Sequence, residues 1–402
     1  MTYDLTRTHA DHIQDLVDQI YNKDLIDKKT YHYLSPNNKM RAGKFYLLPK
    51  IHKEGIPGRP ICSTIDHPTS NISHFVDIHI NKFVPTTSSY IKDTMDFINK
   101  ILNVGPLPEG TIIASLDVVS LYSQIPNDEG IAAVSQMLKK QDAHNPLNKW
   151  ILKLTEAVLK KNNFIFDQKH YLQIGGTAMG TKLAPAYANI FMDNLERRLL
   201  QGYNLQPSLW VRFIDDIFTI WPHGMEEFNL FFSYLNNAHH SIKFTKEVSY
   251  TQIVFLDTIV RVDDQSRCLY TSLHTKPTDT HDYLYHTSSH PTPCKEGGPK
   301  GQFLRIRRIC TKDSDYEIEG IRMIQHYARR GYNIRKLAKT FQSVSTYSQH
   351  GLLNQPPKIN KNLGRIPLIL GFNPRNPNIR DIIMEHWPLL QLHSMAKEAF
   401  QE

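Results

Sequence analysis

Two adjacent aspartates, Asp215 and Asp216, lie in the segment WVRFIDDIFTIW, which otherwise consists mainly of aromatic and β-branched residues. Such a segment is typical of a buried strand, and carboxylates tolerate burial only when they are paired, hydrogen-bonded or bound to a cation. A third acid, Asp117, ends the similar segment TIIASLD. If the two strands are neighbours, the three carboxylates converge and repel one another unless cations lie between them. The pattern therefore predicts a metal site.

Two Mg²⁺ ions about 4 Å apart fit such a group of oxygen ligands, with Mn²⁺ as a substitute. One ion would activate a hydroxyl nucleophile, and the other would hold a triphosphate and its leaving group. The alternative is that adjacent aspartates only mark a tight turn. We assign that role to a second pair, Asp263 and Asp264, because the flanks of this pair in RVDDQSR are polar.

A glycine-rich segment, GGTAMGTKLAPAYANIFM, leads into a predicted long helix. A Walker-type phosphate loop is excluded, because Thr181 separates Gly180 from Lys182. The glycines would instead let the backbone approach a flat ligand or a base pair closely.

Three basic residues, Lys50, Lys53 and Arg59, lie around a predicted turn in LPKIHKEGIPGRPI. Cations on a loop of this kind suit a triphosphate. The alternative for these three residues is a solvated basic turn.

The composition is that of a folded protein with two or three subdomains. Of the 402 residues, 40% are hydrophobic and 21% are charged, which argues against wholesale disorder. The net charge of +8 fits a polyanionic partner such as nucleic acid. The four cysteines include no C-x-x-C pair, so a reducing compartment is expected. The polar N-terminus is not a signal peptide, and no stretch has the roughly 18 apolar residues of a membrane span, so we expect no membrane partner.

The spacing of the apolar residues predicts helices and strands that do not alternate regularly, which indicates the α+β class. Strands are predicted within residues 44–65, 111–122, 163–174, 210–221, 242–249, 253–262 and 268–275. Helices are predicted within residues 11–26, 126–140, 147–161, 175–200 and 225–239, and from about residue 300 onward. After residue 354, where Pro and Asn cluster, we expect loose packing.

Taken in order, these segments resemble a reverse transcriptase, and the family they are most similar to is that of the Penelope-like retroelements. The resemblance covers roughly residues 30–345 and rests on seven motifs in the polymerase order: FYLLPKIHK with GRPICSTIDHPT, SLDVVSLYSQIP, GGTAMGTKLAPAYANIFM, FIDDIF, IKFT, FLDTIV and KPTDTHDYLY. It implies a right-hand polymerase fold whose antiparallel palm sheet carries the catalytic aspartates. The expected domains are an N-terminal helical segment with fingers (1–110), a palm with interleaved fingers helices (111–270), a thumb (271–350) and a C-terminal extension (351–402).

The resemblance implies a role for each matched residue. Asp117 and Asp215 match the two metal-binding aspartates, and Asp216 completes the acidic pair at a hairpin turn. Tyr122, five residues after Asp117, matches the aromatic steric gate that crowds the sugar 2′ position. Gly180 and the start of its helix match the loop beneath the templating base pair.

Further roles concern basic residues. Arg59, together with Lys50 or Lys53, matches the pair that grips the incoming triphosphate. Lys246 matches the general acid for the pyrophosphate leaving group, with Lys243 as the alternative. The segment FLDT resembles the primer grip.

The basic C-terminal region has two interpretations. Its arginines form a solvated surface, or, in a thumb, they track the phosphates of an RNA–DNA duplex; the candidates are Arg305, Arg307, Arg308, Arg329 and Arg330. A zinc site is the minor alternative for the neighbouring His281, His286, His290 and Cys294, whose spacing a zinc ion could use.

We therefore expect an RNA-directed DNA polymerase that extends a DNA primer on an RNA template with dNTPs, inside the cell and in the nucleus. A domesticated, non-catalytic nucleic-acid-binding protein is the alternative, and the three intact aspartates argue against it. An RNA-templated RNA polymerase is a third possibility, and Tyr122 argues against that. Most full-length relatives carry a C-terminal GIY-YIG nuclease. No such signature occurs before Glu402, so we expect polymerase activity alone.

Overall fold

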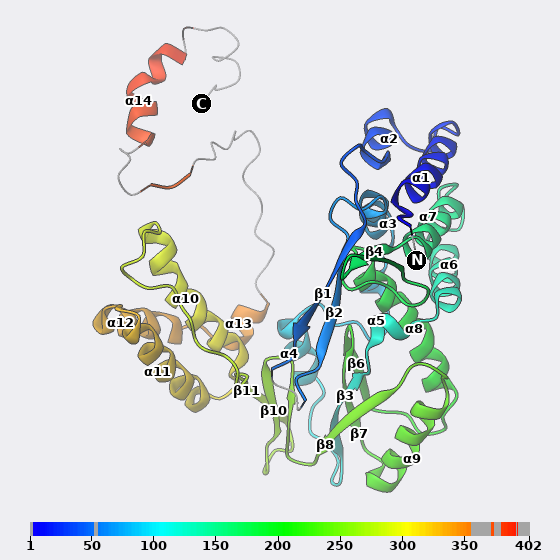
Figure 1. Ribbon diagram of the computed structural model, residues 1–402. Coiled ribbons are helices and arrows are strands. Elements are labelled where there is room, and N and C mark those ends of the chain that lie inside the picture. The colour runs from blue at the N-terminus through cyan, green and yellow to red at the C-terminus, as the bar shows by residue number, and fades with distance from the viewer. Residues whose placement is uncertain (1–2, 52–54, 355–370, 374–378, 391, 393–402) are drawn as a thin grey trace. The chain divides into compact units, whose positions relative to one another are not determined.

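The computed structural model describes residues 3–51, 55–354, 371–373, 379–390 and 392 (Figure 1). The chain divides into two compact units, Met1–Thr278 and Asp279–Glu402. Among the described residues, no helix has the length and apolar character needed to cross a membrane.

The first unit contains three sheets. The central sheet is antiparallel, in the order β6-β7-β3-β8, and consists of β3 (Ile112–Val118), β6 (Leu209–Phe213), β7 (Asp216–Trp221) and β8 (Phe244–Ser249). A three-stranded sheet, in the order β11-β10-β9, consists of β9 (Gln252–Phe255), β10 (Thr258–Val262) and β11 (Leu269–Leu273). The third sheet, in the order β2-β1-β4-β5, consists of β1 (Gly43–Pro49), β2 (Gly58–Ser63), β4 (Asn163–Phe166) and β5 (Lys169–Leu172).

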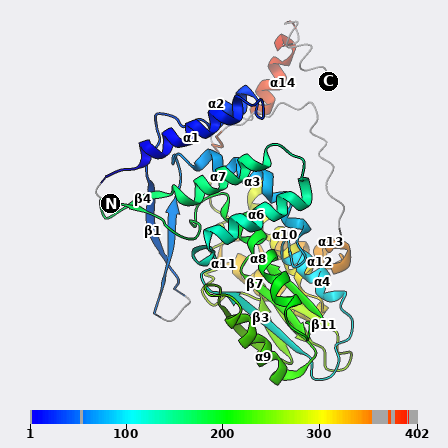
Figure 2. The same ribbon diagram turned by 90° about the vertical axis from the view of Figure 1, so that its right-hand side faces the viewer.

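Helices pack beside these sheets in the first unit, and the strand β1 projects away from most of them (Figures 1 and 2). They are α1 (Thr6–Tyr21), α2 (Lys28–Leu34), α3 (Ser70–Asn81), α4 (Thr94–Leu102), α5 (Leu121–Gln124), α6 (Asn127–Asp142), α7 (Asn148–Lys160), α8 (Ala184–Gln201) and α9 (Gly224–Asn237), with the 3₁₀ helix η1 (Val84–Thr86). The second unit is helical, as predicted, with α10 (Thr292–Ile309), α11 (Asp313–Arg329), α12 (Ile334–Ser345), α13 (Gln349–Leu353) and α14 (Ile379–Leu390).

The two faces of the central sheet differ because side chains alternate along each strand. On one face, Leu116 and Ile217 pack into the main core together with side chains of α8 and α9, such as Phe191 and Phe231 (Figure 1). On the other face, Phe218 packs in ring contact with Phe97 of α4 and Phe255 of β9. Asp117 and Asp216 lie on this second face, two positions along the strands from Ser115 and Phe218.

Several predicted elements are confirmed. The segment 44–65 forms the antiparallel pair β1–β2, and β3 and β7 are neighbours, which was the condition for the three carboxylates to converge. Asp263 and Asp264 lie in the turn between β10 and β11, and the Asp263 carboxylate accepts hydrogen bonds from the Ser266 N–H and hydroxyl at 3.1 Å. Most of the tail after residue 354, for which loose packing was predicted, lies outside the described residues.

Candidate active site

The predicted metal ligands lie at one end of the central sheet. Asp117 of β3 is directly opposite Asp216 of β7 in the antiparallel register, so both side chains leave the sheet on the same face. The Val118 N–H donates to the Asp215 carbonyl oxygen at 3.0 Å, which continues the ladder into the β6–β7 turn. All three aspartates are half-buried. The structure thus brings Asp117 and Asp216 together and places Asp215 at the adjoining turn.

The turn that carries Asp215 is short and strained. It consists of Ile214 and Asp215 between the ends of β6 and β7. Ile214 has a φ of 57°, in the left-handed region, which costs an L-residue roughly 1–2 kcal/mol. Strained residues of this kind persist only where the surrounding structure holds them, and they cluster at functional sites.

Asp117 and Asp216 open into a cavity of about 810 Å³. The same face of β3 and β8 contributes Ser115, Thr245 and Glu247 to its wall, because these residues alternate with the buried ones. The FLDT segment predicted as the primer grip spans the β9–β10 turn and forms another wall, and the remaining lining residues include Lys246, His274 and Lys276.

Tyr122 lies on the other side of the acidic pair. The pKa of its hydroxyl is raised to about 12, mainly by burial and then by the negative charge of Asp215, against an opposing effect of Arg59. Tyr122, Asp215 and Arg59 therefore lie close enough to interact electrostatically. The ring packs against the main core, and this contact fixes its position beside the acidic turn.

The glycine loop connects these elements. The Thr177 N–H donates to the Tyr122 carbonyl oxygen at 2.7 Å, and the Cys62 N–H of β2 donates to the Met179 carbonyl oxygen at 2.9 Å. Gly180 has a φ of 130°, and a Cβ there would lie 2.4 Å from the Cys62 carbonyl oxygen. A Cβ on Gly176 would lie 2.7 Å from the Tyr122 carbonyl oxygen. Both glycines are thus required by close contact with the protein's own backbone, and a base pair need not be invoked to explain them.

The donor set suits a hard divalent cation. Carboxylate oxygens are the ligands that Mg²⁺ prefers, and Asp117 and Asp216 face each other on an open cavity. Within the described residues, the three aspartates do not form a group whose ligand atoms all lie within 4.8 Å of one another.

The family models identify the fold from sequence. Residues 51–266, more than half of the chain, match the family described as reverse transcriptase (RNA-dependent DNA polymerase). The chain belongs to the reverse transcriptase family. Residues 282–342 match a second family, described as an animal helix-turn-helix domain. No match is found among curated proteins.

Solved structures agree with the fold of this reverse transcriptase. Telomerase from Candida albicans, in complex with the TWJ fragment of telomeric RNA, is similar with a TM-score of 0.54 at 12% identity, over 83% of this chain and 59% of that chain. A truncated apo telomerase from Candida tropicalis (TM-score 0.44, 11% identity, 58% of this chain and 55% of that chain) also matches. The BmCPV RNA-dependent RNA polymerase at elongation state matches with a TM-score of 0.46 at 10% identity, over 81% of this chain and 28% of that chain. The chain therefore spans less than two thirds of these matched chains. The predicted α+β right-hand polymerase fold is confirmed, and the central sheet is its palm.

The predicted general acid, Lys246, lines the same cavity as Asp117 and Asp216, but its ammonium is held away from them. Lys246 pairs with Leu116 in the β3–β8 register, one position away from Asp117, so its side chain lies on the helix-covered face of the palm. Its ammonium donates to the Asn229 side chain of α9 and lies 4.5 Å from the centre of the Phe232 ring. Lys246 itself is among the residues that line the acidic cavity, so its role as a general acid stays a prediction, which would require the ammonium to leave Asn229. The alternative, Lys243, uses its ammonium to donate to carbonyl oxygens at the end of α9.

The predicted triphosphate ligands are only partly placed. Arg59 lies exposed on β2, opposite Leu48 of β1. Lys50 follows β1, and its N–H donates to the Pro57 carbonyl oxygen at 2.9 Å across the base of the loop. Lys53 lies outside the described residues. Arg59 is thus the cation of this set that the structure places near Tyr122.

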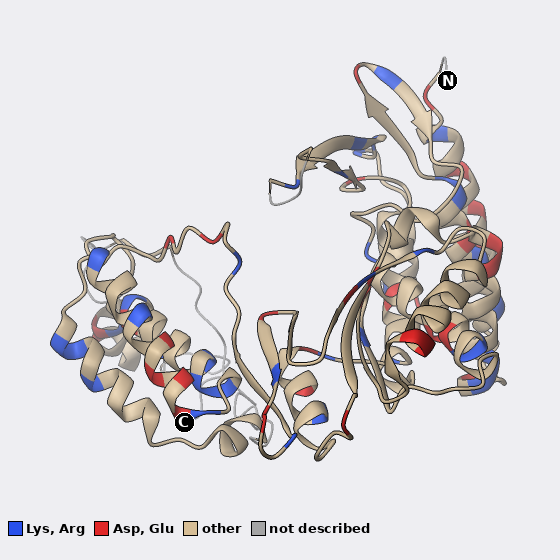
Figure 3. Ribbon diagram, turned by 90° about the horizontal axis from the view of Figure 1, so that it is seen from below, with Lys and Arg blue, Asp and Glu red and all other residues tan. Residues whose placement is uncertain are grey.

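In the second unit, two of the predicted nucleic-acid contacts have internal partners. Arg307 pairs with Asp313 at 2.8 Å, donates to the Tyr347 carbonyl oxygen at 2.7 Å and stacks over Tyr316. Arg330 pairs with Asp282 and stacks over Tyr285. Arginine and lysine nevertheless recur along the helices of this unit (Figure 3), and Arg329 is exposed, whereas Arg305 and Arg308 are half-buried. Arg307 and Arg330 are therefore better explained as residues that stabilise the second unit itself.

The turn between α11 and α12 explains the helix-turn-helix match. Gly331, with a φ of 84°, ends α11, and the Asn333 side chain caps α12 by accepting from the Lys336 N–H at 3.2 Å. The glycine and the capping asparagine were visible in the sequence as a helix stop and a helix start. The sequence interpretation as a thumb overlooked this motif.

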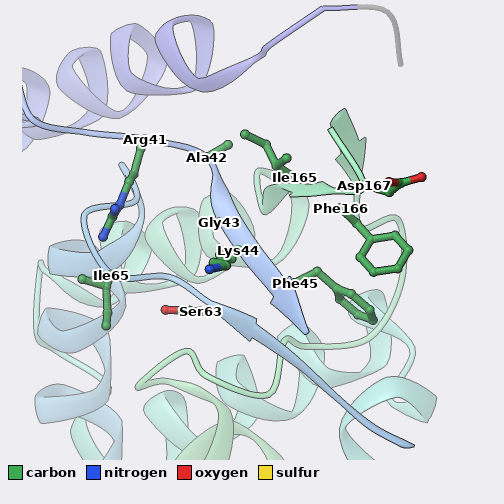
Figure 4. Close-up of a pocket in the computed structure, with 10 residues that line it drawn as sticks. All are labelled: Arg41, Ala42, Gly43, Lys44, Phe45, Ser63, Ile65, Ile165, Phe166 and Asp167. Atoms are coloured by element: carbon green, nitrogen blue, oxygen red, sulfur yellow. The ribbon is translucent and has the colours of Figure 1, made fainter. Parts of the chain in front are cut away.

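A second cavity, of about 400 Å³, lies where β1 and β4 diverge (Figure 4). Phe45 and Phe166 lie side by side at one end of it, with ring centres 5.2 Å apart, and Lys44 lies at another side. None of the predicted catalytic residues lines this cavity, so it is separate from the acidic site.

Two other groups of side chains were candidates for metal binding. The first is held together by hydrogen bonds, and the second does not cluster. In the described part of the chain, Glu129, His239 and His240 form the one group of metal-ligating side chains with all ligand atoms within 4.8 Å. The Nδ1 atom of His239 accepts from the backbone N–H groups of Ser241 and Ile242, so Nε2 carries the proton and donates to Glu129 at 3.1 Å. The minor zinc candidates His281, His286, His290 and Cys294 do not form such a group in the described chain.

One charged residue of the palm had no part in the predicted site. Arg212, in the middle of β6, is fully buried. The signal for it was present in WVRFIDDIF, because a guanidinium in an apolar strand requires partners for the same reason as the acidic pair.

Proposed function

We propose that this protein is the RNA-directed DNA polymerase of a Penelope-like retroelement, which transfers a nucleotide from a dNTP to a primer 3′-OH with two Mg²⁺ ions. One observation carries the proposal: the β3–β7 register sets Asp117 opposite Asp216, with Asp215 at the adjoining turn beside Tyr122. A protein that only bound nucleic acid would have no need of three acids in this arrangement.

Each side of the acidic turn has a proposed role. Asp117, Asp215 and Asp216 would hold the metal ions, which when bound activate the primer hydroxyl and neutralise the charge that develops on the phosphates. Arg59 would bind the triphosphate on the Tyr122 side, and the Tyr122 ring would exclude a 2′-hydroxyl. The cavity lined by Asp117 and Asp216 would receive the primer end.

An RNA template with a DNA primer is the proposed partner. The family description supports this, as does the similar Candida albicans telomerase, whose structure contains a fragment of telomeric RNA. In the second unit, the exposed Arg329, Arg335 and Lys339 would contact phosphates, since such contacts position a duplex without reading its sequence. We further propose an intracellular, nuclear location.

The competing function is a domesticated protein that binds nucleic acid without catalysis. The helix-turn-helix match favours it, because a DNA-binding helix-turn-helix module needs no catalytic site. The two functions differ in what the aspartates do, since a binder would tolerate their substitution.

Primer extension on an RNA template tests the proposal, with Mg²⁺ or Mn²⁺ and with deoxy- or ribonucleotides. Asp117→Asn and Asp215→Asn should each lower extension about 10³-fold or more, with duplex binding retained. Asp264→Asn is the matched control, because Asp264 is exposed in the β10–β11 turn, and it should keep full activity. Extension that survives in both Asp117→Asn and Asp215→Asn would refute the mechanism.

A further inference from the structure

Arg212 uses every hydrogen-bond donor of its guanidinium inside the palm. Nε donates to Glu196 at 2.9 Å, and one terminal nitrogen donates to the Asn189 side chain at 2.8 Å and to the Ile214 carbonyl oxygen at 2.9 Å. The other terminal nitrogen donates to the Ser89 hydroxyl at 3.4 Å and to the Asn189 carbonyl oxygen at 3.3 Å. These five contacts account for all five N–H groups of an arginine.

The contact with Ile214 connects this network to the acidic turn. Ile214 is the residue with positive φ that directly precedes Asp215. The other partners, Glu196 and Asn189, belong to α8, the helix that follows the glycine loop. Ser89 belongs to a segment that pairs with β6. The backbone N–H of Arg212 donates to the Ser89 carbonyl oxygen at 2.6 Å. Arg212 therefore holds a strained turn against a long helix.

The charge itself indicates that the network has a role beyond stability. Arg212 and Glu196 are 0% and 1% exposed at their side chains, and a buried ion pair is commonly matched or exceeded in stability by apolar residues of similar volume. What apolar residues cannot supply is a directed donor to the Ile214 carbonyl oxygen. Lysine cannot supply all five contacts either, because it has three donors and no planar fork.

We propose that Arg212 is a positioning residue for Asp215: by holding the Ile214 carbonyl oxygen, it sets the backbone of the turn and so the affinity of the acidic site for divalent metal. This inference rests on the proposed function, since it assigns metal binding to Asp215. Outer contacts that orient a metal ligand typically change metal affinity by about 10–100-fold when they are removed.

The test compares Arg212→Lys with wild type by Mn²⁺ titration, in which electron paramagnetic resonance measures the free ion without any substrate. We expect the Mn²⁺ dissociation constant to rise about tenfold or more. The Mg²⁺ concentration for half-maximal extension should rise in parallel, with little change in the KM for template–primer. Asn189→Ala, which removes one partner of the same guanidinium nitrogen, should give a smaller rise and carries the test if Arg212→Lys does not fold.

Two controls separate positioning from loss of stability. Leu199→Ala removes a buried side chain of α8 and should lower the Tm without changing the Mn²⁺ dissociation constant. Arg198→Lys alters an ion pair between α8 and Glu129 of α6 and should change neither quantity. A folded Arg212→Lys protein with wild-type Mn²⁺ affinity refutes the inference. If Asp215→Asn also leaves both Mn²⁺ affinity and extension unchanged, the proposed function has failed as well.

Discussion

The sugar gate gives the sharpest test of the proposed chemistry. Tyr122 is anchored through its backbone, because the Thr177 N–H donates to its carbonyl oxygen at 2.7 Å and Gly176 packs against the same group. Truncation to Tyr122→Val should therefore remove the ring and leave the chain in place. We expect the variant to accept ribonucleotides.

The size of the effect follows from the packing of the ring. A ring held against the core leaves room for hydrogen at the sugar 2′ carbon but not for a hydroxyl, and forcing one extra group into close-packed protein costs roughly 1–3 kcal/mol. With about 1.4 kcal/mol for each factor of ten, discrimination against ribonucleotides should fall by about 10–10²-fold. Tyr122→Phe keeps the ring and should keep the gate.

The assay is kcat/KM for matched deoxy- and ribonucleotides, measured for wild type, Tyr122→Val and the control Tyr203→Val. Tyr203 packs against Trp221 and Phe231 on the helix face of the palm, so truncating it should affect both nucleotide types equally. Because the pKa of Tyr122 is raised to about 12, the hydroxyl stays protonated and discrimination should not change between pH 6 and 9. An unchanged nucleotide ratio in Tyr122→Val would show that the ring is an ordinary core residue.

Two further predictions concern Lys246 and His67. Lys246→Ala should lower the single-turnover extension rate by less than about threefold, because its ammonium is held on the helix face, whereas loss of a general acid costs about 10²–10⁴-fold; a loss of that size would support its predicted role. Burial lowers the pKa of His67 to about 4, so the folded protein keeps this imidazole neutral while the unfolded chain takes up a proton below pH 6.5. The free energy of unfolding should therefore fall by up to about 3 kcal/mol as the pH drops from 6.5 to 4. Urea denaturation of wild type and His67→Asn measures this, and equal pH dependence in the two proteins would contradict the assignment.

Much of the site was visible in the sequence because it follows from local chemistry. Acids inside apolar segments require cations or partners wherever the strands go, so the residues alone singled out Asp117, Asp215 and Asp216, on the condition that their strands are neighbours; the structure meets that condition. The polar flanks of Asp263 and Asp264 were likewise enough to identify a turn.

The tertiary structure decided which side chains share a face and which cations are already paired. Side chains alternate with a period of two, so a register difference of one residue moved Lys246 to the side of the palm opposite Asp117. The acidic partners of Arg307 and Arg330 lie 6 and 48 residues away in the chain, and no spacing rule specifies the more distant one. The five contacts of Arg212 come from three segments that only the fold brings together. Register and long-range pairing depend on how the whole core packs, and local sequence does not encode them.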